Sequence, residues 1–210
     1  MKHMNPIFNR FMKNITITGD IENDFYNFLL ENGHKKTADH CLRVGRKAEE
    51  IAITFGVDPM KAKIAGYLHD ISAVFPNSER VDVARELGLE VLKEEEVFPM
   101  IIHQKISGAM AELIFNVQEN DVNSAIACHT TLKANASELD KVLFVADKIE
   151  WDQDGTPPYL EKIEHYLKDS LDSASFVYIK FLFDNKEKLK VIHPYLESAY
   201  YDLQNKVILE

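Results

Sequence analysis

Apolar residues recur at helical spacing through most of this chain, and runs in which apolar and polar residues alternate are hard to find. The clearest example is the segment from Thr37 to Phe55. Its apolar residues fall on one stripe of a helix, at Cys41, Val44, Ala48, Ile51, Ala52 and Phe55. Gly56 follows where such a helix would end, because glycine readily adopts the left-handed conformation of a C-terminal cap. The sequence therefore predicts an all-α fold.

More helices are predicted on both sides of the histidine-rich middle of the chain. Asp58 and Pro59 mark a helix start, because Asp caps free amides and proline suits the first helical position. This helix is expected to end near His69 and Asp70. The other predicted helices cover residues 78–87, 101–115, 121–128 and 138–150, with two or three more in 159–210. The clearest loop is 154–158, which contains glycine and two prolines.

The size and charge of the chain limit its class. With 210 residues, 46% of them apolar and 28% charged, the chain fits one globular domain. Cys41 and Cys128 form no CxxC pair, so neither a disulfide framework nor a thiolate zinc site is expected. The formal charge of -10 argues against nucleic acids and anionic membranes as partners, since surplus Lys and Arg bind them. Without an apolar stretch suited to a signal peptide or membrane span, we expect a cytoplasmic protein.

Histidines and aspartates gather in unusually apolar surroundings. Four of the eight histidines lie on or beside predicted helices among apolar neighbours: His40, His69, His103 and His129. Asp70 and Asp147 also follow or interrupt apolar helical runs. A buried carboxylate needs a cation, hydrogen bonds or a metal to offset its lost hydration. Nitrogen and carboxylate ligands without thiolates favour a transition metal such as iron, manganese, zinc, cobalt or nickel.

The order of these residues resembles a known family. His40, then His69-Asp70, then Asp147 resembles the H...HD...D signature of HD-domain phosphohydrolases, and His103 and His129 match two extra histidines of its dinuclear members. The flanking segments resemble the YqeK-like branch, the symmetrical diadenosine tetraphosphate hydrolases. These segments are His40-Cys-Leu-Arg43-Val44, Leu68-His-Asp-Ile71, His129-Thr-Thr131 and Ala146-Asp-Lys-Ile-Glu150. The likeness spans roughly residues 37–150.

The resemblance implies a single-domain HD helical bundle with two divalent transition-metal ions. The implied ligands are His40, His69, Asp70, His103, His129 and Asp147. Asp70 would bridge the ions and orient a metal-activated water that attacks phosphorus. Iron is the first expectation, because members of the branch are associated with a di-iron centre, and manganese, cobalt, nickel and zinc are alternatives. In this branch the reaction splits diadenosine tetraphosphate into two ADP.

Three residues are candidates for substrate contacts. Arg43 lies one helical turn after His40, where it could reach a phosphate, although pairing with a core carboxylate is equally open. Thr130 and Thr131 could bond the substrate, or they could satisfy the backbone at a helix end.

The expected organisation follows from the same resemblance. Residues 1–20 would be an N-terminal extension and residues 21–210 the HD-domain bundle, with the metal-site core at about 37–150 and C-terminal helices at 159–210. The expected partner is a nucleotide substrate, and a homodimer is left open.

The chain also departs from the branch at three positions. Ala73 stands in place of a usual Lys, Leu132 in place of Gly, and Gln153 in place of Arg. Because lost cations weaken the binding of a polyanion, these positions leave the substrate open. The alternatives are another nucleotide phosphohydrolase or phosphodiesterase, a di-iron oxygenase of the same superfamily, and a catalytically weak nucleotide-binding regulatory module.

Other notable residues are interpreted as structural. Cys41 and Cys128 are expected in the core, as is the aromatic group Phe176, Tyr178, Phe181 and Phe183. The run Glu94-Glu95-Glu96 is interpreted as a solvated face. Four histidines receive no catalytic role: His3, His34, His165 and His193.

Overall fold

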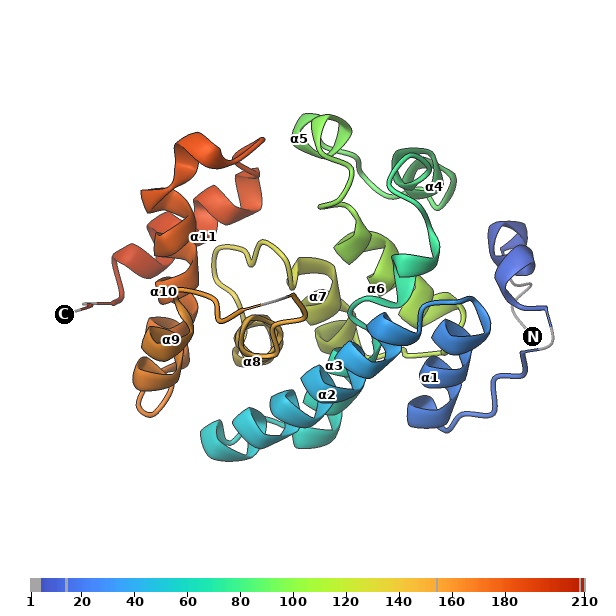
Figure 1. Ribbon diagram of the computed structural model, residues 1–210, viewed down its shortest axis with the longest axis horizontal. Coiled ribbons are helices and arrows are strands. Elements are labelled where there is room, and N and C mark those ends of the chain that lie inside the picture. Colours follow the sequence, from blue (N-terminus) through green and yellow to red (C-terminus); the bar gives the residue numbers. More distant parts are fainter. Residues whose placement is uncertain (1–4, 14, 154, 208, 210) are drawn as a thin grey trace.

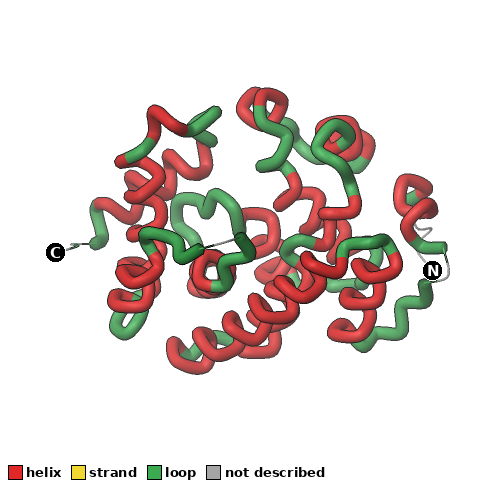
Figure 2. The backbone as a smooth tube through the Cα atoms, viewed as in Figure 1, coloured by secondary structure: helices red, strands yellow, loops and turns green. Residues whose placement is uncertain are grey.

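The structure is a computed structural model that describes residues 5–13, 15–153, 155–207 and 209, and every regular element among them is a helix (Figures 1 and 2). The prediction of an all-α fold is thus confirmed. The α-helices are α1 Ile21–Glu31, α2 Lys35–Phe55, α3 Pro59–Leu68, α4 Arg80–Glu86, α5 Lys93–Val97, α6 His103–Leu113, α7 Asn120–Cys128, α8 Glu138–Ile149, α9 Leu160–Tyr166, α10 Leu171–Asp184 and α11 Pro194–Gln204. Three 3-10 helices complete the fold: η1 Pro6–Phe11, η2 Ile71–Val74 and η3 Lys186–Lys188.

Helices α2 and α3 pack backbone to backbone. A Cβ atom added at Gly66 would lie 2.5 Å from the Cα atom of Gly45, and one added at Gly45 would lie 2.3 Å from the ring of Tyr67. Only glycine at both positions allows this close approach. The contact fixes the end of α3, where His69 follows the last helical residue, against the helix that contains His40.

The predicted helix boundaries between α2 and α3 are confirmed in detail. Gly56 caps α2 in the left-handed conformation, with φ of 69°. The Asp58 side chain accepts hydrogen bonds from the amides of Met60 and Lys61, and Pro59 is the first residue of α3. These caps satisfy backbone groups that a helix end leaves without partners.

The N-terminal part contains helices that the periodicity analysis did not assign. Asp24 of α1 accepts hydrogen bonds from the amides of Thr18 and Gly19, which ties the preceding segment to the helix. Phe25 and Phe28 of α1 and Phe8 of η1 are fully buried. Burial of these aromatic rings stabilises two short helices whose local sequence gives a weak signal.

The C-terminal helices α9, α10 and α11 form a group beside α8, seen at the opposite end of the molecule from the N-terminus in Figure 1. Of the aromatic residues expected in the core here, Phe176 is buried, whereas Tyr178, Phe181 and Phe183 are only partly buried. The expectation is corrected for these three. The Phe183 ring instead stacks on Tyr200 of α11, with 3.9 Å between ring centroids.

Glu95 corrects the interpretation of Glu94-Glu95-Glu96 as a solvated face. Its side chain is fully buried on α5 and pairs with Lys105 at 2.9 Å and with His193 at 3.3 Å. It also accepts a hydrogen bond from the Leu92 amide. Because His193 caps the N-terminus of α11, this cluster joins α5 to the C-terminal helices. Buried charge here is compensated by paired groups that are distant in sequence.

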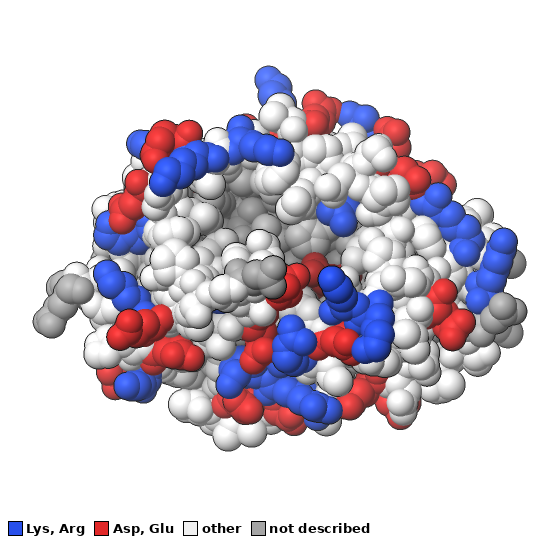
Figure 3. Space-filling view, viewed as in Figure 1, with Lys and Arg blue, Asp and Glu red and all other residues white. Residues whose placement is uncertain are grey.

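The molecule is hollowed on one face. The space-filling view shows a depression over α7 and α8, between α11 on one side and α5 and α6 on the other (Figures 1 and 3). Within the described residues, no helix has the length and apolar character required to cross a lipid bilayer.

Candidate metal centre

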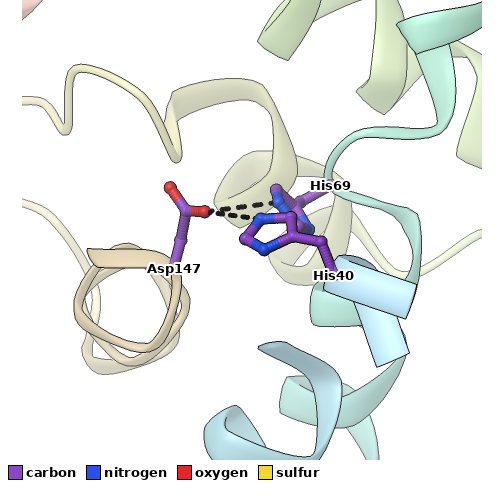
Figure 4. A group of neighbouring side chains, drawn as sticks. All are labelled: His40, His69 and Asp147. Atoms are coloured by element: carbon purple, nitrogen blue, oxygen red, sulfur yellow. Dashed lines mark hydrogen bonds and ion pairs between the residues drawn. The ribbon is translucent and has the colours of Figure 1, made fainter. Parts of the chain in front are cut away.

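Six side chains from five segments converge at one place in the bundle. His40 comes from α2, His69 and Asp70 from the end of α3, His103 from the first residue of α6, His129 from the end of α7 and Asp147 from α8. Figure 4 shows His40, His69 and Asp147 pointing toward one another from three of these segments. The structure therefore brings together all six residues that the sequence singled out as ligands.

The Asp147 side of the centre joins three of these residues. Asp147 Oδ1 lies 3.2 Å from His40 Nε2 and 3.4 Å from His69 Nε2 (Figure 4). The potential ligand atoms of the three residues all lie within 4.8 Å of one another. His40 and His69 are buried, and the Asp147 side chain is 15% exposed. This spacing is compatible with one shared cation.

The Asp70 side of the centre is built around two oxygen atoms that face different partners. Asp70 Oδ1 lies 3.0 Å from His103 Nε2 and 3.6 Å from His129 Nε2. Asp70 Oδ2 lies 3.6 Å from His69 Nε2. Asp70 thus faces His103 and His129 with one oxygen and His69 with the other, which is the arrangement that a bridging carboxylate requires.

Three of the histidines share one tautomer. The Nδ1 atoms of His69, His103 and His129 each donate to the backbone carbonyl three residues earlier, at 2.7, 2.5 and 2.8 Å. Neutral rings in this state have an unprotonated Nε2, the form that coordinates metals. The Nε2 atoms of His103 and His129 lie 3.0 Å apart, and His69 Nε2 is buried with no hydrogen-bond partner among the residues that the structure describes. Facing lone pairs repel unless a cation lies among them, so the donor set fits a divalent metal.

Charge and burial favour the metal-binding forms of two of these residues, Asp147 and His129. Burial alone would raise the pKa of Asp147, but Lys148 and His40 outweigh it and hold this pKa well below its usual range. Lys148 is itself buried, pairs with the Asp147 carboxylate and donates to the His129 carbonyl at 3.3 Å. Burial lowers the pKa of His129 to about 4, so its ring is neutral near pH 7.

Asp70 is less enclosed than the sequence suggested. Its side chain is 28% exposed, against the expectation of a buried carboxylate. The physical reason is its position at the end of α3, where the chain turns into η2. Solvent therefore reaches the Asp70 side of the centre more freely than the Asp147 side.

The loop after His129 is held by Gln104, a residue that the sequence analysis missed. The buried Gln104 side chain accepts hydrogen bonds from the amides of Thr130 and Thr131, at 3.0 and 3.3 Å. Thr131 is buried and its hydroxyl donates to the Leu132 carbonyl, which favours its structural role. The Thr130 hydroxyl lies 3.2 Å from His129 Nε2, beside the centre.

Leu132 adopts a conformation that suits glycine. Its φ angle is 55°, in the left-handed region, and its side chain is fully buried. The residue usually found at this position in the resembling branch is Gly, which adopts that conformation without steric cost. The departure noted in the sequence thus has a backbone consequence in the loop that holds His129 and Thr130.

The Arg43 side chain pairs with a carboxylate. Its Nε atom donates to Glu150 at 3.2 Å and its Nη1 atom to the Asp39 carbonyl at 3.2 Å. Of the two roles that the sequence left open, this geometry favours pairing within the protein. Cys41 and Cys128 are buried, as expected for core residues.

A protein-family model of the HD domain matches residues 37–152. The chain belongs to the HD-domain family. It is accordingly a metal-dependent phosphohydrolase, which confirms the resemblance and the enzyme class inferred from the H...HD...D residues. The matched segment includes all six residues of the candidate metal centre.

Relatives of this HD-domain protein are found in bacteria. It is 44% identical over 151 residues to an uncharacterised protein of the pepC 5′ region in Lactococcus lactis subsp. cremoris, covering 72% of this chain and 76% of that protein. It is 33% identical over 112 residues to a symmetrical bis(5′-nucleosyl)-tetraphosphatase of Bacillus subtilis, covering 53% of this chain and 59% of the relative.

A solved structure has a similar fold. It is described as a predicted HD superfamily hydrolase involved in NAD metabolism from Clostridium acetobutylicum. The TM-score is 0.79 at 24% identity, and the match covers 88% of this chain and 97% of the other.

Proposed function

We propose that this HD-domain protein hydrolyses the polyphosphate chain of a nucleotide, with diadenosine tetraphosphate as substrate and two ADP as products. The observation that supports this most is a pair of residue groups, each close enough to hold a metal ion, that share His69. One group is His40, His69 and Asp147, and the other is His69, Asp70 and His129. The name of the Bacillus subtilis relative supplies the substrate class.

The proposed ligands divide between two neighbouring positions. His40, His69 and Asp147 would hold one divalent ion, and His103 and His129 a second, with Asp70 shared between the positions. Iron is proposed first, with manganese, cobalt, nickel or zinc as alternatives. When bound, such ions supply a water of lowered pKa and neutralise charge on phosphoryl oxygens.

The protein's own residues prepare this chemistry. The partly exposed Asp70 carboxylate lies where it can orient the attacking water. Lys148 keeps Asp147 ionised, and the carbonyl partners of His69, His103 and His129 fix their ring orientation before substrate arrives. The Thr130 hydroxyl, beside His129 Nε2, is the proposed contact for a phosphoryl oxygen.

The direct test is product analysis with defined metal content. Protein purified without oxygen, and aliquots reconstituted with iron, manganese, cobalt, nickel or zinc, are incubated with diadenosine tetraphosphate and the products separated by chromatography. We expect ADP as the only product. Intact substrate with every metal, or AMP and ATP as products, contradicts the proposed function.

A second candidate is hydrolysis of another nucleotide phosphate. The observation in its favour is the loss of cationic residues at Ala73 and Gln153, relative to the resembling branch. A panel of mono-, di- and triphosphates and cyclic nucleotides, compared by kcat/KM, separates the two candidates. A higher kcat/KM for any of these than for diadenosine tetraphosphate would favour the second.

A further inference from the structure

Within the part of the chain that the structure describes, Arg80 has no carboxylate partner. It is the first residue of α4, is partly buried, and forms no ion pair among the described residues. Every other arginine of the chain pairs with an acidic side chain, namely Arg10 with Glu79, Arg43 with Glu150, Arg46 with Glu22, and Arg85 with Asp82 and Glu96. A partly buried cation in an acidic protein normally has such a partner.

Two backbone carbonyls fix the Arg80 guanidinium. Its Nε atom donates to the Phe75 carbonyl at 3.1 Å and its Nη1 atom to the Met100 carbonyl at 3.4 Å. The Met100 carbonyl also accepts the hydrogen bond from His103 Nδ1. Phe75 directly follows η2, the turn that Asp70 begins. Arg80 therefore lies between the two segments that position Asp70 and His103.

The charge of Arg80 acts on the centre. Burial lowers the pKa of Arg80, and the negative charge of Asp70 opposes that change, so the two groups interact through space. A guanidinium remains protonated under such conditions and has five N–H donors in a planar fork. The two carbonyls use only part of this fork. The remaining donors suit a phosphate, which arginine binds through parallel hydrogen bonds.

Neither of the two nearby candidates for a phosphate contact supplies a free cation. Ala73, three residues after Asp70 in η2, contributes no charge, and Arg43 is paired with Glu150. A polyphosphate approaching a protein with a formal charge of -10 needs local positive charge beyond the metal ions. We propose that Arg80 binds a phosphoryl group adjacent to the one that reacts, and so selects substrates with a chain of phosphates. This inference rests on the proposed function at the same centre.

The test compares Arg80 with Arg85, an exposed arginine on the same helix. Affinities of the metal-loaded protein for ADP and AMP are measured by calorimetry, with KM and kcat for diadenosine tetraphosphate. We expect R80Q to weaken ADP binding and raise KM by about tenfold or more, with little change in AMP binding or kcat. R80K should fall between R80Q and wild type, because lysine keeps the charge but not the fork. R85Q should match wild type.

Metal content and Tm are measured for each variant. An unchanged ADP affinity in R80Q, equal to that of R85Q, overturns the inference. If R80Q alone loses metal, R80K replaces it, and ADP affinity equal to wild type overturns the inference. Loss of metal from both R80Q and R80K would mean that Arg80 serves to hold Met100 and His103 in place, and this result would also overturn the inference.

The same data distinguish this inference from the proposed function. Absence of diadenosine tetraphosphate hydrolysis by wild type, together with weakened ADP binding by R80Q, rejects the proposed substrate and retains Arg80 as a phosphate contact. Hydrolysis by wild type, with R80Q indistinguishable from R85Q, retains the proposed substrate and rejects Arg80 as a phosphate contact.

Discussion

The two sides of the candidate metal centre differ in enclosure and in charge. On the Asp147 side, His40 and His69 are buried and Lys148 offsets the carboxylate. On the Asp70 side, the carboxylate is 28% exposed and the His103 side chain 14% exposed, with Thr130 and Arg80 nearby. We therefore propose that the Asp147 side chiefly holds the centre together and that the Asp70 side meets the substrate.

Replacing Asp70 should separate catalysis from folding. D70N is expected to lower kcat/KM on the order of a thousandfold, because the shared carboxylate is lost where water must be oriented. The metal-free protein should lose less unfolding free energy than the Lys148 variant described next, since the Asp70 side chain is partly exposed and D70N removes only its charge interactions with His69 and His103. Steady-state kinetics and urea unfolding with EDTA check both. Residual activity near that of wild type would remove Asp70 from the reaction.

Replacing Lys148 should instead have its main effect on the stability of the metal-free protein. K148M keeps an unbranched apolar side chain of similar length beside Phe144 and Tyr178, but it removes the cation over their rings and leaves Asp147 without its buried partner. We expect the metal-free protein to lose about 3–5 kcal/mol of unfolding free energy. K180M, which removes an exposed pair with Asp184, serves as control and should cost about 1 kcal/mol or less. Equal losses in the two variants would break the contrast between the sides.

The pH dependence of stability should change when metal binds. In the metal-free protein burial alone would lower the pKa of His69, but Asp70 and Asp147 hold it well above the usual value. A raised pKa gives stability that is present below about pH 6.5 and lost as pH rises through the folded pKa, at up to about 1.4 kcal/mol per pH unit for one proton. Metal binding requires neutral His69 and removes this loss.

Urea unfolding between pH 6 and 9, with EDTA or with manganese, measures this difference. We expect a falling stability with EDTA and a flat or rising one with manganese. Parallel curves under the two conditions would show that His69 does not exchange a proton for metal.

The smallest expected effect is the difference in stability between two variants of Leu132, which lies in the loop on the Asp70 side. L132A removes buried apolar contacts and keeps the left-handed strain, whereas L132G removes slightly more contact area and relieves about 1 kcal/mol of strain. Both variants should be less stable than wild type, but L132G should be at least as stable as L132A. Urea unfolding of L132A and L132G measures which variant is more stable. A clearly lower stability for L132G would mean that this backbone is not strained.

The six residues that converge at the centre could be singled out from the sequence because imidazoles and carboxylates in apolar helices are unusual, and their order matched a family signature. Helix ends with specific local chemistry, such as Gly56 and Asp58, could be predicted from the sequence equally well. Glu95 was not, because three adjacent glutamates look alike until folding brings Lys105 and His193 to one of them. Arg80 was missed for a related reason. Its significance is the lack of a partner, which only tertiary structure reveals.

The most direct measurement is anomalous diffraction from crystals of manganese-loaded protein. We expect two ions in one centre, one contacting His40, His69 and Asp147, and the other contacting His103 and His129, with Asp70 touching both. Anomalous peaks located away from these side chains, or none under conditions where the protein is active, would contradict a dinuclear centre at these residues.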